Sequence, residues 1–473
     1  MANTSEKINQ VGAEEKGNPN ISPQDGDIVD GNSAPHDEVF GTMTEDGPNY
    51  RGLGWLGTVA LMMKTQIGLG VLSLPKVFDL VGMVPGVLLL CIVAATATWT
   101  SCMVGVFKFQ HREVYSMDDA GRLMFGKIGY FFFGVAFCLY WIFVAGSAML
   151  GISIGLNAIS SHATCTATFV AVAAILGFLL ASIRTFGRIS WLAWVGLTCI
   201  LISIFIVTIA VGIQDRPASA PQEGPWSSDF EIIRTPTFTD GVRAVSLLTF
   251  ACSATPAYFS LVAEMRDPQL FQRAVVVSQA GSTIVYLVIA VVVYYFCGSY
   301  VSSPALGSAG PLIKKIAYGL SLPGLFVTLA IDIHLTGKYI FLQLLRGTKH
   351  LNANTWVHWG TWLACTFGST IVAYLIASGI PVFDGLVSLI CALLSTVLAY
   401  QPTGCMWFYD NWNLPKAQRG SWWKLMVFWS AFIVVVGCFM TVAGTYGSIV
   451  GIIDSLNKSG GTKPWSCADN SSS

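Results

Sequence analysis

Charged residues are scarce in this chain of 473 residues. Asp, Glu, Lys and Arg together make up 11% of it, whereas 53% is hydrophobic. A soluble domain carries roughly 25% charged residues, so this chain lacks the polar groups that would cover a globule in water. The composition excludes a soluble protein and indicates an all-α polytopic membrane protein.

The sequence also lacks the residue patterns of several functional classes. It has no Cys and His cluster with zinc spacing, no phosphate-binding P-loop, and no nucleophile beside a plausible base. Its 26 basic and 26 acidic residues cancel, so net charge does not indicate a nucleic-acid partner. We therefore expect no enzyme activity, no catalytic residue, no metal, no organic cofactor and no binding of nucleic acid.

Residues 1–50 are rich in Asn, Asp, Glu, Gly, Pro and Ser and poor in apolar residues. Such a segment cannot bury enough surface to fold, so we predict a disordered tail. It lacks the basic start, apolar core and small-residue cleavage site of a signal peptide. The first apolar run must then act as the insertion signal.

Apolar runs long enough to cross a hydrocarbon core of ~30 Å follow this tail. We predict eleven spans, at about 57–78, 83–107, 128–157, 166–183, 189–213, 241–263, 274–298, 322–345, 356–378, 382–405 and 422–453. Before the eighth, the stretch GPLIKKIAYGL (310–320) spaces its apolar residues helically around two lysines. We interpret that stretch as a short interfacial helix.

Basic residues in the loops predict the orientation, because Lys and Arg are retained on the cytoplasmic side. With the N-terminus inside, fifteen fall in internal segments: Lys7, Lys16, Arg51, Lys108, Arg112, Arg122, Lys127, Arg184, Arg188, Arg266, Arg273, Arg346, Lys349, Lys416 and Arg419. Six fall in external segments: Arg216, Arg234, Lys314, Lys315, Lys458 and Lys463. The N-terminus is therefore predicted to be cytoplasmic and the C-terminus external.

This map divides the chain into a tail and a core. The core, 51–405, holds ten spans in two halves of five, 57–213 and 241–405, joined by an external loop at 214–240. A cytoplasmic loop and the eleventh span occupy 406–453, and an external tail occupies 454–473. Ten of the twelve cysteines fall in spans; Cys165 and Cys467 fall outside the membrane on the same face. We predict that these two form a disulfide, which an oxidising exterior permits.

The first span carries the unusual stretch KTQIGLGVLSLP (64–75). Glycines may open a membrane helix only where it is buried in protein or lines a cavity; alternatively, they are small residues for close packing. The sixth span is also interrupted, by small polar residues and Pro256. Interrupted helices in corresponding positions of two halves favour a transporter site.

The chemistry of a broken helix suits an amino acid. Its second half begins with unpaired N–H groups and the positive end of a helix dipole, which suit a carboxylate. Carbonyls at the end of its first half suit an ammonium group. We predict that the substrate binds at Ile67, Gly68, Leu69, Gly70, Phe250, Ala251, Cys252 and Ser253, with Tyr140 of the third span as an aromatic cover.

Four stretches carry a resemblance to a known family: IGLGVLSLP (67–75), EMRDP (264–268), VSSPALGSAGPL (301–312) and KPWSC (463–467). The chain resembles the amino acid/auxin permease family, in particular fungal neutral amino acid permeases of the methyltryptophan-resistance type. The resemblance covers about residues 50–467. It implies a LeuT-type core of five plus five inverted spans with an eleventh appended, and secondary active uptake of neutral aliphatic and aromatic amino acids.

The resemblance also bears on the coupling ion. Sodium-coupled members of the family carry Asn four residues before the first glycine of the first-span motif, where this chain has Lys64. We therefore expect a proton as the coupling ion, with Lys64, Asp332 and Thr328 as the coupling residues. The alternative for Lys64 is a side chain that snorkels to the cytoplasmic surface.

Other interpretations stay open at this point. Glu264, Arg266 and Asp267 either mark where the sixth span leaves the membrane or take part in gating. The chain could also be an amino-acid sensor that does not transport, or a vacuolar exporter rather than an importer in the plasma membrane. The preferred amino acid and the oligomeric state cannot be read from the sequence.

Overall fold

The computed structural model describes residues 36–37, 41–42, 52–183, 186–217, 219–348, 350–351, 355–380, 382–458, 465 and 467–471. The predicted tail at 1–50 lies outside the described residues apart from two short paired strands, β1 (His36–Asp37) and β2 (Gly41–Thr42). The other regular elements of the described residues are helices, joined by turns and loops. The long helices are α2 (Trp55–Gln66), α3 (Leu69–Val81), α4 (Met83–Gln110), α5 (Met117–Ser160), α6 (Thr166–Ala181), α7 (Phe186–Ile213), α8 (Phe238–Cys252), α10 (Phe271–Cys297), α11 (Pro311–Leu345), α12 (Trp356–Gly379), α14 (Thr396–Asn411), α15 (Ser421–Phe439) and α16 (Thr445–Lys458).

These helices confirm the all-α membrane architecture. Among the described residues, nine helices are long and apolar enough to cross a bilayer, and α2 with α3 forms a tenth as a bent pair. The 16-residue α6 occupies the predicted fourth span. Two spans contain a π-helical segment: Cys391–Ser395 joins α13 (Phe383–Ile390) to α14, and Met440–Gly444 joins α15 to α16.

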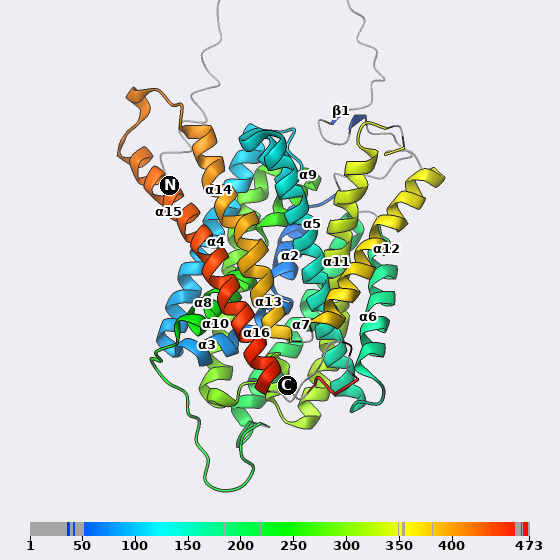
Figure 1. The fold of residues 1–473 in the computed structure, drawn as a ribbon, viewed down its shortest axis with the longest axis vertical. Helices are drawn as coiled ribbons and strands as arrows, with labels where there is room; N and C mark the ends of the chain where they lie inside the picture. The colour runs from blue at the N-terminus through cyan, green and yellow to red at the C-terminus, as the bar shows by residue number, and fades with distance from the viewer. Residues whose placement is uncertain are drawn as a thin grey trace, which may run out of the picture.

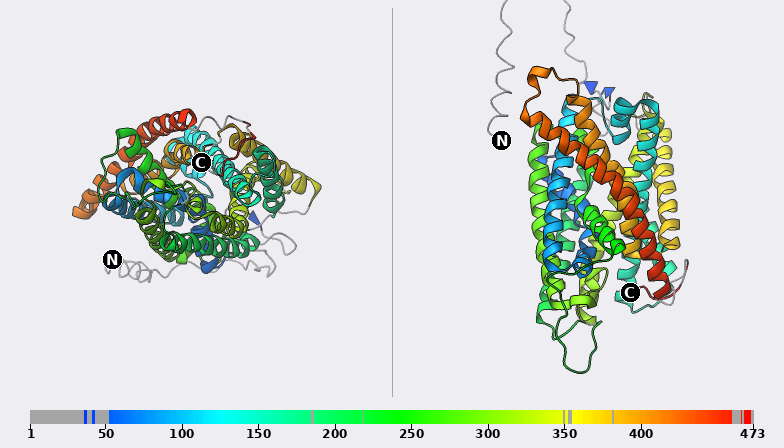
Figure 2. Two further views of the ribbon diagram at one scale, coloured as in Figure 1. Left: turned by 90° about the horizontal axis from the view of Figure 1, so that it is seen from below. Right: turned by 60° about the vertical axis from the view of Figure 1, so that its left-hand side comes forward.

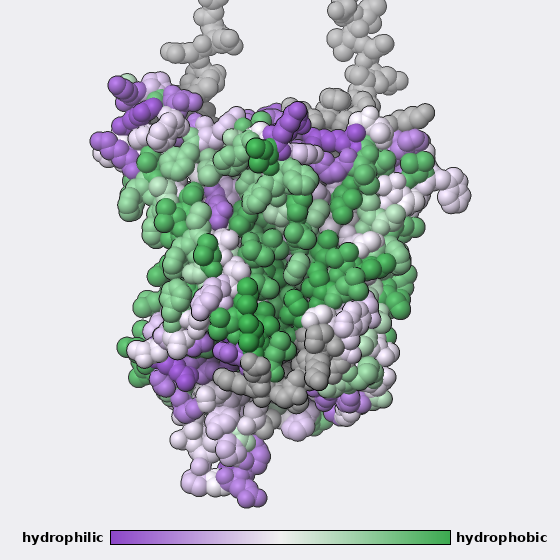
Figure 3. Space-filling view, in the orientation of Figure 1, coloured by the Kyte–Doolittle hydropathy of each residue, from purple (hydrophilic) through white to green (hydrophobic). Residues whose placement is uncertain are grey.

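The surface is arranged as a membrane requires. Figure 3 shows a broad apolar band between polar ends of the bundle. The connection between α7 and α8 projects at the same end as the end of α16, and α9 (Tyr258–Glu264) lies at the opposite end with the connection between α14 and α15 (Figure 1). Segments predicted to be external thus lie at one end and segments predicted to be internal at the other.

Two predicted boundaries are wrong. The stretch 310–320 is no separate interfacial helix, because α11 runs without a break from Pro311 to Leu345. At ~1.5 Å per residue its 35 residues span about 52 Å, so its first turns extend beyond the hydrocarbon. The lysines there have polar partners, since Lys314 donates to the carbonyl of Ser471 and Lys315 to the hydroxyl of Ser161.

The third span begins earlier than predicted. Helix α5 starts at Met117, and a kink at Gly126 separates its first turns from the predicted span. Gly126 has φ of 67°, a conformation that glycine adopts without steric cost. The sequence prediction began after this kink because the apolar run begins there.

The helices form a closed bundle, seen from its end in Figure 2. Helices α5, α6, α11 and α12 contact one another, and α2, α3, α4, α8 and α10 form a second group of neighbours. The span from Phe238 to Glu264 is the most enclosed, with 94% of its most apolar window buried. Protein rather than lipid therefore surrounds the sixth span, as an interrupted helix requires.

The C-terminal tail returns to the bundle. Cys467 forms a disulfide with Cys165, the residue before α6, with a Cα–Cα distance of 4.4 Å. This is the pair that the sequence predicts. Asn470 is buried, accepts from Asn157 at 2.7 Å and donates to Ser153 at 3.0 Å, so it fixes the tail against α5.

Candidate functional site

The first span is broken where the sequence predicts. Helix α2 ends at Gln66 and α3 begins at Leu69, with Ile67 and Gly68 non-helical between them. The two half-helices meet at a bend of 48°. A Cβ placed on Gly68 would lie 3.2 Å from Oγ1 of Thr328 on α11, so the chain needs a very small residue at this break.

The sixth span is broken as well. Helix α8 ends at Cys252, and Ser253 has an extended backbone with φ of −103° and ψ of 106°. A short 3₁₀ turn, Thr255–Ala257, then leads into α9. Pro256 lies in that turn and has no N–H to continue a regular helix.

The two breaks lie against each other. Helices α3 and α8 are in contact, and a Cβ placed on Gly70 would lie 2.6 Å from Cα of Ala251. The predicted residues Ile67, Gly68 and Gly70 are therefore brought together with Ala251, Cys252 and Ser253. Phe250 is buried one residue earlier, and Leu69 is the first residue of α3.

The backbone carbonyls at the end of α8 already accept hydrogen bonds from side chains. Tyr286 donates its hydroxyl to the carbonyl of Ala251 at 2.8 Å. The carbonyl of Cys252 accepts from Nε2 of Gln66 at 3.3 Å and from Nε2 of Gln279 at 3.2 Å. A carbonyl has two lone pairs, so a bound ammonium group would have to share these acceptors or replace the donors.

Tyr140 lies where the sequence predicts, next to the break in the sixth span. Its hydroxyl donates to the carbonyl of Ser253 at 3.5 Å, and its ring lies 4.9 Å from that of Trp141. Both residues are buried. An aromatic side chain of α5 therefore covers the break from the opposite group of helices.

Two polar atoms at the breaks have no hydrogen-bond partner among the described residues. They are Oε1 of Gln66 and Oγ of Ser253, both buried. Leaving a buried acceptor or donor unpaired costs about 1–3 kcal/mol, so native proteins generally pair such atoms or supply a partner from a ligand or water. These atoms are suited to bind a polar ligand.

The predicted coupling residues lie beside the same break. Lys64 is fully buried; its ammonium group donates to Oγ1 of Thr328 and, at 3.4 Å, to the carbonyl of Ile67. It therefore does not snorkel to the surface. It links α2 to α11 directly.

Asp332 is not in direct contact with Lys64 in the way a simple ion pair would require. The Lys64 ammonium group donates its hydrogen bonds to Thr328 and Ile67, and Asp332 lies four residues after Thr328 on α11. Oδ2 of Asp332 is buried and has no hydrogen-bond partner among the described residues. The structure therefore brings Lys64 and Thr328 into contact, whereas Asp332 lies one turn further along α11.

Sequence reasoning missed Gln66, Gln279, Tyr258 and Tyr286. Gln66 lies inside the quoted first-span stretch, and its Nε2 also donates to the Tyr258 hydroxyl at 3.3 Å. Gln279 and Tyr286 are seven residues apart, so they lie on one face of α10. A glutamine and a tyrosine spaced seven residues apart in an apolar run indicate a polar face on that helix, and this spacing could have identified them from the sequence.

Glu264 differs in burial from Arg266 and Asp267, the two charged residues that follow it. It is buried and paired with Lys338 of α11, whereas Arg266 and Asp267 are exposed. Arg266 and Asp267 thus mark the exit of the sixth span from the bundle. Glu264 does not, because its carboxylate remains inside the protein.

Solved structures show a similar helix arrangement. Mhp1, a nucleobase-cation-symport-1 family transporter in a closed conformation with bromovinylhydantoin bound, is 14% identical with a TM-score of 0.51, covering 90% of this chain and 97% of its own. MhsT in complex with L-phenylalanine is 11% identical with a TM-score of 0.53, covering 82% and 98%. The chain therefore has the LeuT-type fold expected from its sequence, the fold of a membrane transporter.

The family is shown by sequence. The model for the family described as transmembrane amino acid transporter protein matches residues 51–450, and the chain belongs to this family. A transmembrane transporter of Gibberella moniliformis is 34% identical over 429 residues, 90% of each chain. The N amino acid transport system protein of Neurospora crassa is 32% identical over 435 residues, again 90% of each.

Proposed function

We propose that this protein imports neutral aliphatic and aromatic amino acids by secondary active symport with protons. The unpaired Oε1 of Gln66 and Oγ of Ser253 at the facing breaks carry the proposal. The ammonium group of an amino acid can donate to these atoms, and its carboxylate can accept from the N–H groups that begin α3. One zwitterion then satisfies both ends of the site.

Neutral substrates fit the side chains at the breaks. The side chains at the sixth-span break are uncharged and would not favour an acidic or basic substrate: Gln66, Gln279, Tyr140, Tyr258 and Tyr286. The ammonium group of Lys64 is bonded to Thr328 and to the carbonyl of Ile67. Two comparisons support the same class of ligand. The Neurospora relative is named as an amino acid transport system protein, and MhsT was solved with L-phenylalanine.

Proton coupling rests on Lys64, Thr328 and Asp332. A buried ammonium group fills the space between α2 and α11 in which a metal cation would need oxygen ligands. Protonation of Asp332, which is buried one turn from Thr328, would neutralise a carboxylate near the Lys64 ammonium group and weaken the attraction between the two helix groups. Alternating access then follows if the broken spans rock against α5, α6, α11 and α12.

Import places the protein in the plasma membrane. The end with Arg346 and Lys416 would face the cytoplasm, and the end with the Cys165–Cys467 disulfide would face the oxidising exterior. A vacuolar location would make the same fold an exporter from the vacuole.

The test is uptake into proteoliposomes that contain the purified protein. Labelled leucine and phenylalanine should accumulate when the outside is acidified, and a sodium gradient at equal pH should have no effect. Arginine and glutamate serve as charged competitors, and empty liposomes as the control. Saturable binding without uptake would show a receptor instead, and accumulation that follows sodium would contradict proton coupling.

A further inference from the structure

A buried ion pair lies away from the breaks. Glu264 is the last residue of α9, and Lys338 lies on α11; their side chains are 2% and 4% exposed. Burying two charges is costly unless they pair, and removing one partner leaves the other uncompensated. The pair therefore holds α9 against α11 strongly in this conformation.

The backbone extends the effect of this pair to the first span. Leu53, two residues before α2, donates to the carbonyl of Glu264 at 3.2 Å, and Arg266 donates to the carbonyl of Leu53 at 2.8 Å. The beginning of the first span and the end of the sixth are thus hydrogen-bonded side by side. The ion pair therefore secures α9 to α11 and, through these backbone bonds, adds to the direct Lys64–Thr328 contact that holds α2 there.

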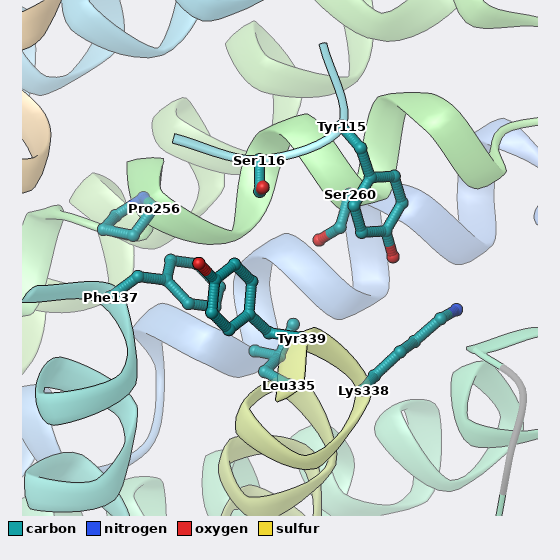
Figure 4. Close-up of a pocket in the computed structure, with 8 residues that line it drawn as sticks. All are labelled: Tyr115, Ser116, Phe137, Pro256, Ser260, Leu335, Lys338 and Tyr339. Atoms are coloured by element: carbon teal, nitrogen blue, oxygen red, sulfur yellow. The ribbon is translucent and has the colours of Figure 1, made fainter. Parts of the chain in front are cut away.

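A small cavity lies beside the pair. Its lining comes from the segment before α5, from α5 itself, from the broken sixth span and from α11 (Figure 4). Pro256, in the turn at the sixth-span break, lines one part of the cavity, and Lys338 and Tyr339 project from α11. Its volume of about 10 Å³ is enough for roughly one water molecule.

A second cavity continues the line toward the end of α11. Tyr115, Ser116 and Tyr339 line both cavities and so form the wall between them. The second is also lined by Asp119 and Arg346, a buried carboxylate and an exposed guanidinium that form an ion pair at 3.1 Å. The two cavities mark a closed route from the break to the end of the bundle that carries Arg346.

We propose that the Glu264–Lys338 pair is the lock that closes this route, and that its separation lets α2 and α9 move from α11 and opens the site to that face. The inference rests on the proposed transport function but concerns a different step. It assigns Glu264 and Lys338 a positioning role in the conformational change, with no contact to the substrate.

The test uses a cysteine at Ser260, a buried residue that lines the first cavity. Ser260→Cys is placed in four backgrounds: otherwise unchanged, Glu264→Gln, Lys338→Gln, and the exchange Glu264→Lys with Lys338→Glu. A membrane-impermeant thiol reagent is added to either face, and mass spectrometry of the peptide measures the labelling rate. Only variants that remain monodisperse in gel filtration are compared.

Each single substitution should raise labelling from the Arg346 face by about tenfold or more, since removing one partner of a buried pair shifts the closed state strongly. The exchange should return labelling toward the unchanged background. Asp79→Asn is the matched control, because Asp79 is also a buried acid paired with cations, Lys76 and Arg234.

Equal labelling in all four backgrounds would overturn the lock, as would an exchange variant labelled as fast as the single variants. A rise of equal size from the opposite face would overturn it too, because it would show general loosening. Labelling requires no substrate, so this result and the uptake result can fail independently.

Discussion

A Cβ on Gly70 would lie 2.6 Å from Cα of Ala251, closer than real Cβ atoms approach backbone. The atom it meets is backbone, which a rotamer change cannot move. The first and sixth spans therefore touch beside the positions where both are interrupted.

We expect Gly70→Ala to reduce the initial rate of amino acid uptake by about 10-fold to 100-fold, because helices displaced by about 1 Å no longer hold a substrate in register. Gly368→Ala in α12 is the matched control, since a Cβ there meets nothing within 4 Å. Both variants are purified, checked for equal reconstitution and assayed together. Normal uptake by Gly70→Ala would mean that the contact only packs two helices.

Gly68→Val extends the same test to the first break. Its Cβ would press on Oγ1 of Thr328, the hydroxyl that accepts from Lys64. We expect uptake to be abolished while the amount of protein at the cell surface is unchanged, measured by surface labelling beside uptake. Undiminished transport would remove Gly68 from the site.

Asp332→Asn should separate coupling from translocation. The substitution removes a titratable carboxylate that is buried one turn from Thr328. It should abolish accumulation driven by a proton gradient, while exchange of labelled for unlabelled amino acid persists. Lys64→Ala should give the same pattern. Asp384→Asn is the control, because Asp384 is a buried acid that accepts from Ser303 outside the coupling group.

The two measurements decide the role of Asp332. Equal loss of accumulation and exchange would indicate a structural role for the carboxylate. Full accumulation by Asp332→Asn would show that the proton is carried elsewhere.

The breaks could be predicted from sequence because glycine and proline act locally. Gly68 lies at the break of the first span and Pro256 at that of the sixth. Their positions in two long apolar runs indicated the site before any contact was known. Lys64 was recognisable for a similar reason, since an ammonium group inside a span is costly in any arrangement.

The partners of the carbonyls could not be predicted in the same way. Gln279 and Tyr286 reach Cys252 and Ala251 only because α10 is rotated with that face inward, and rotation about a helix axis is decided by packing. The error at 310–320 has a similar cause. The partner of Lys314 is Ser471, 157 residues further along the chain.

The C-terminal tail connects four helices of one group. Cys467 is bonded to the residue before α6, Asn470 to α5, Lys314 of α11 to the carbonyl of Ser471, and the N–H of Trp465 to the carbonyl of Ser378 in α12. These are the helices that the broken spans would move against. A tail bound to all four keeps that group together while α2 and α9 change position.

Removing the disulfide should therefore lower stability. It closes a separation of 302 residues, and disulfides typically contribute about 2–4 kcal/mol; the hydrogen bonds of Asn470 and Trp465 should retain part of the tail contact. We expect Cys165→Ser, Cys467→Ser and the double variant to lower the thermal midpoint by the same amount, because each removes the same single bond. Cys438→Ser, which replaces an exposed free cysteine, is the control and should leave the midpoint unchanged.

The midpoint is measured by aggregation of the purified protein in detergent, and a reductant should bring the unsubstituted protein to the value of the variants. A double variant less stable than either single would show that the two sulfurs act separately, and an unchanged midpoint in all three would mean that the tail contributes nothing to holding the four helices.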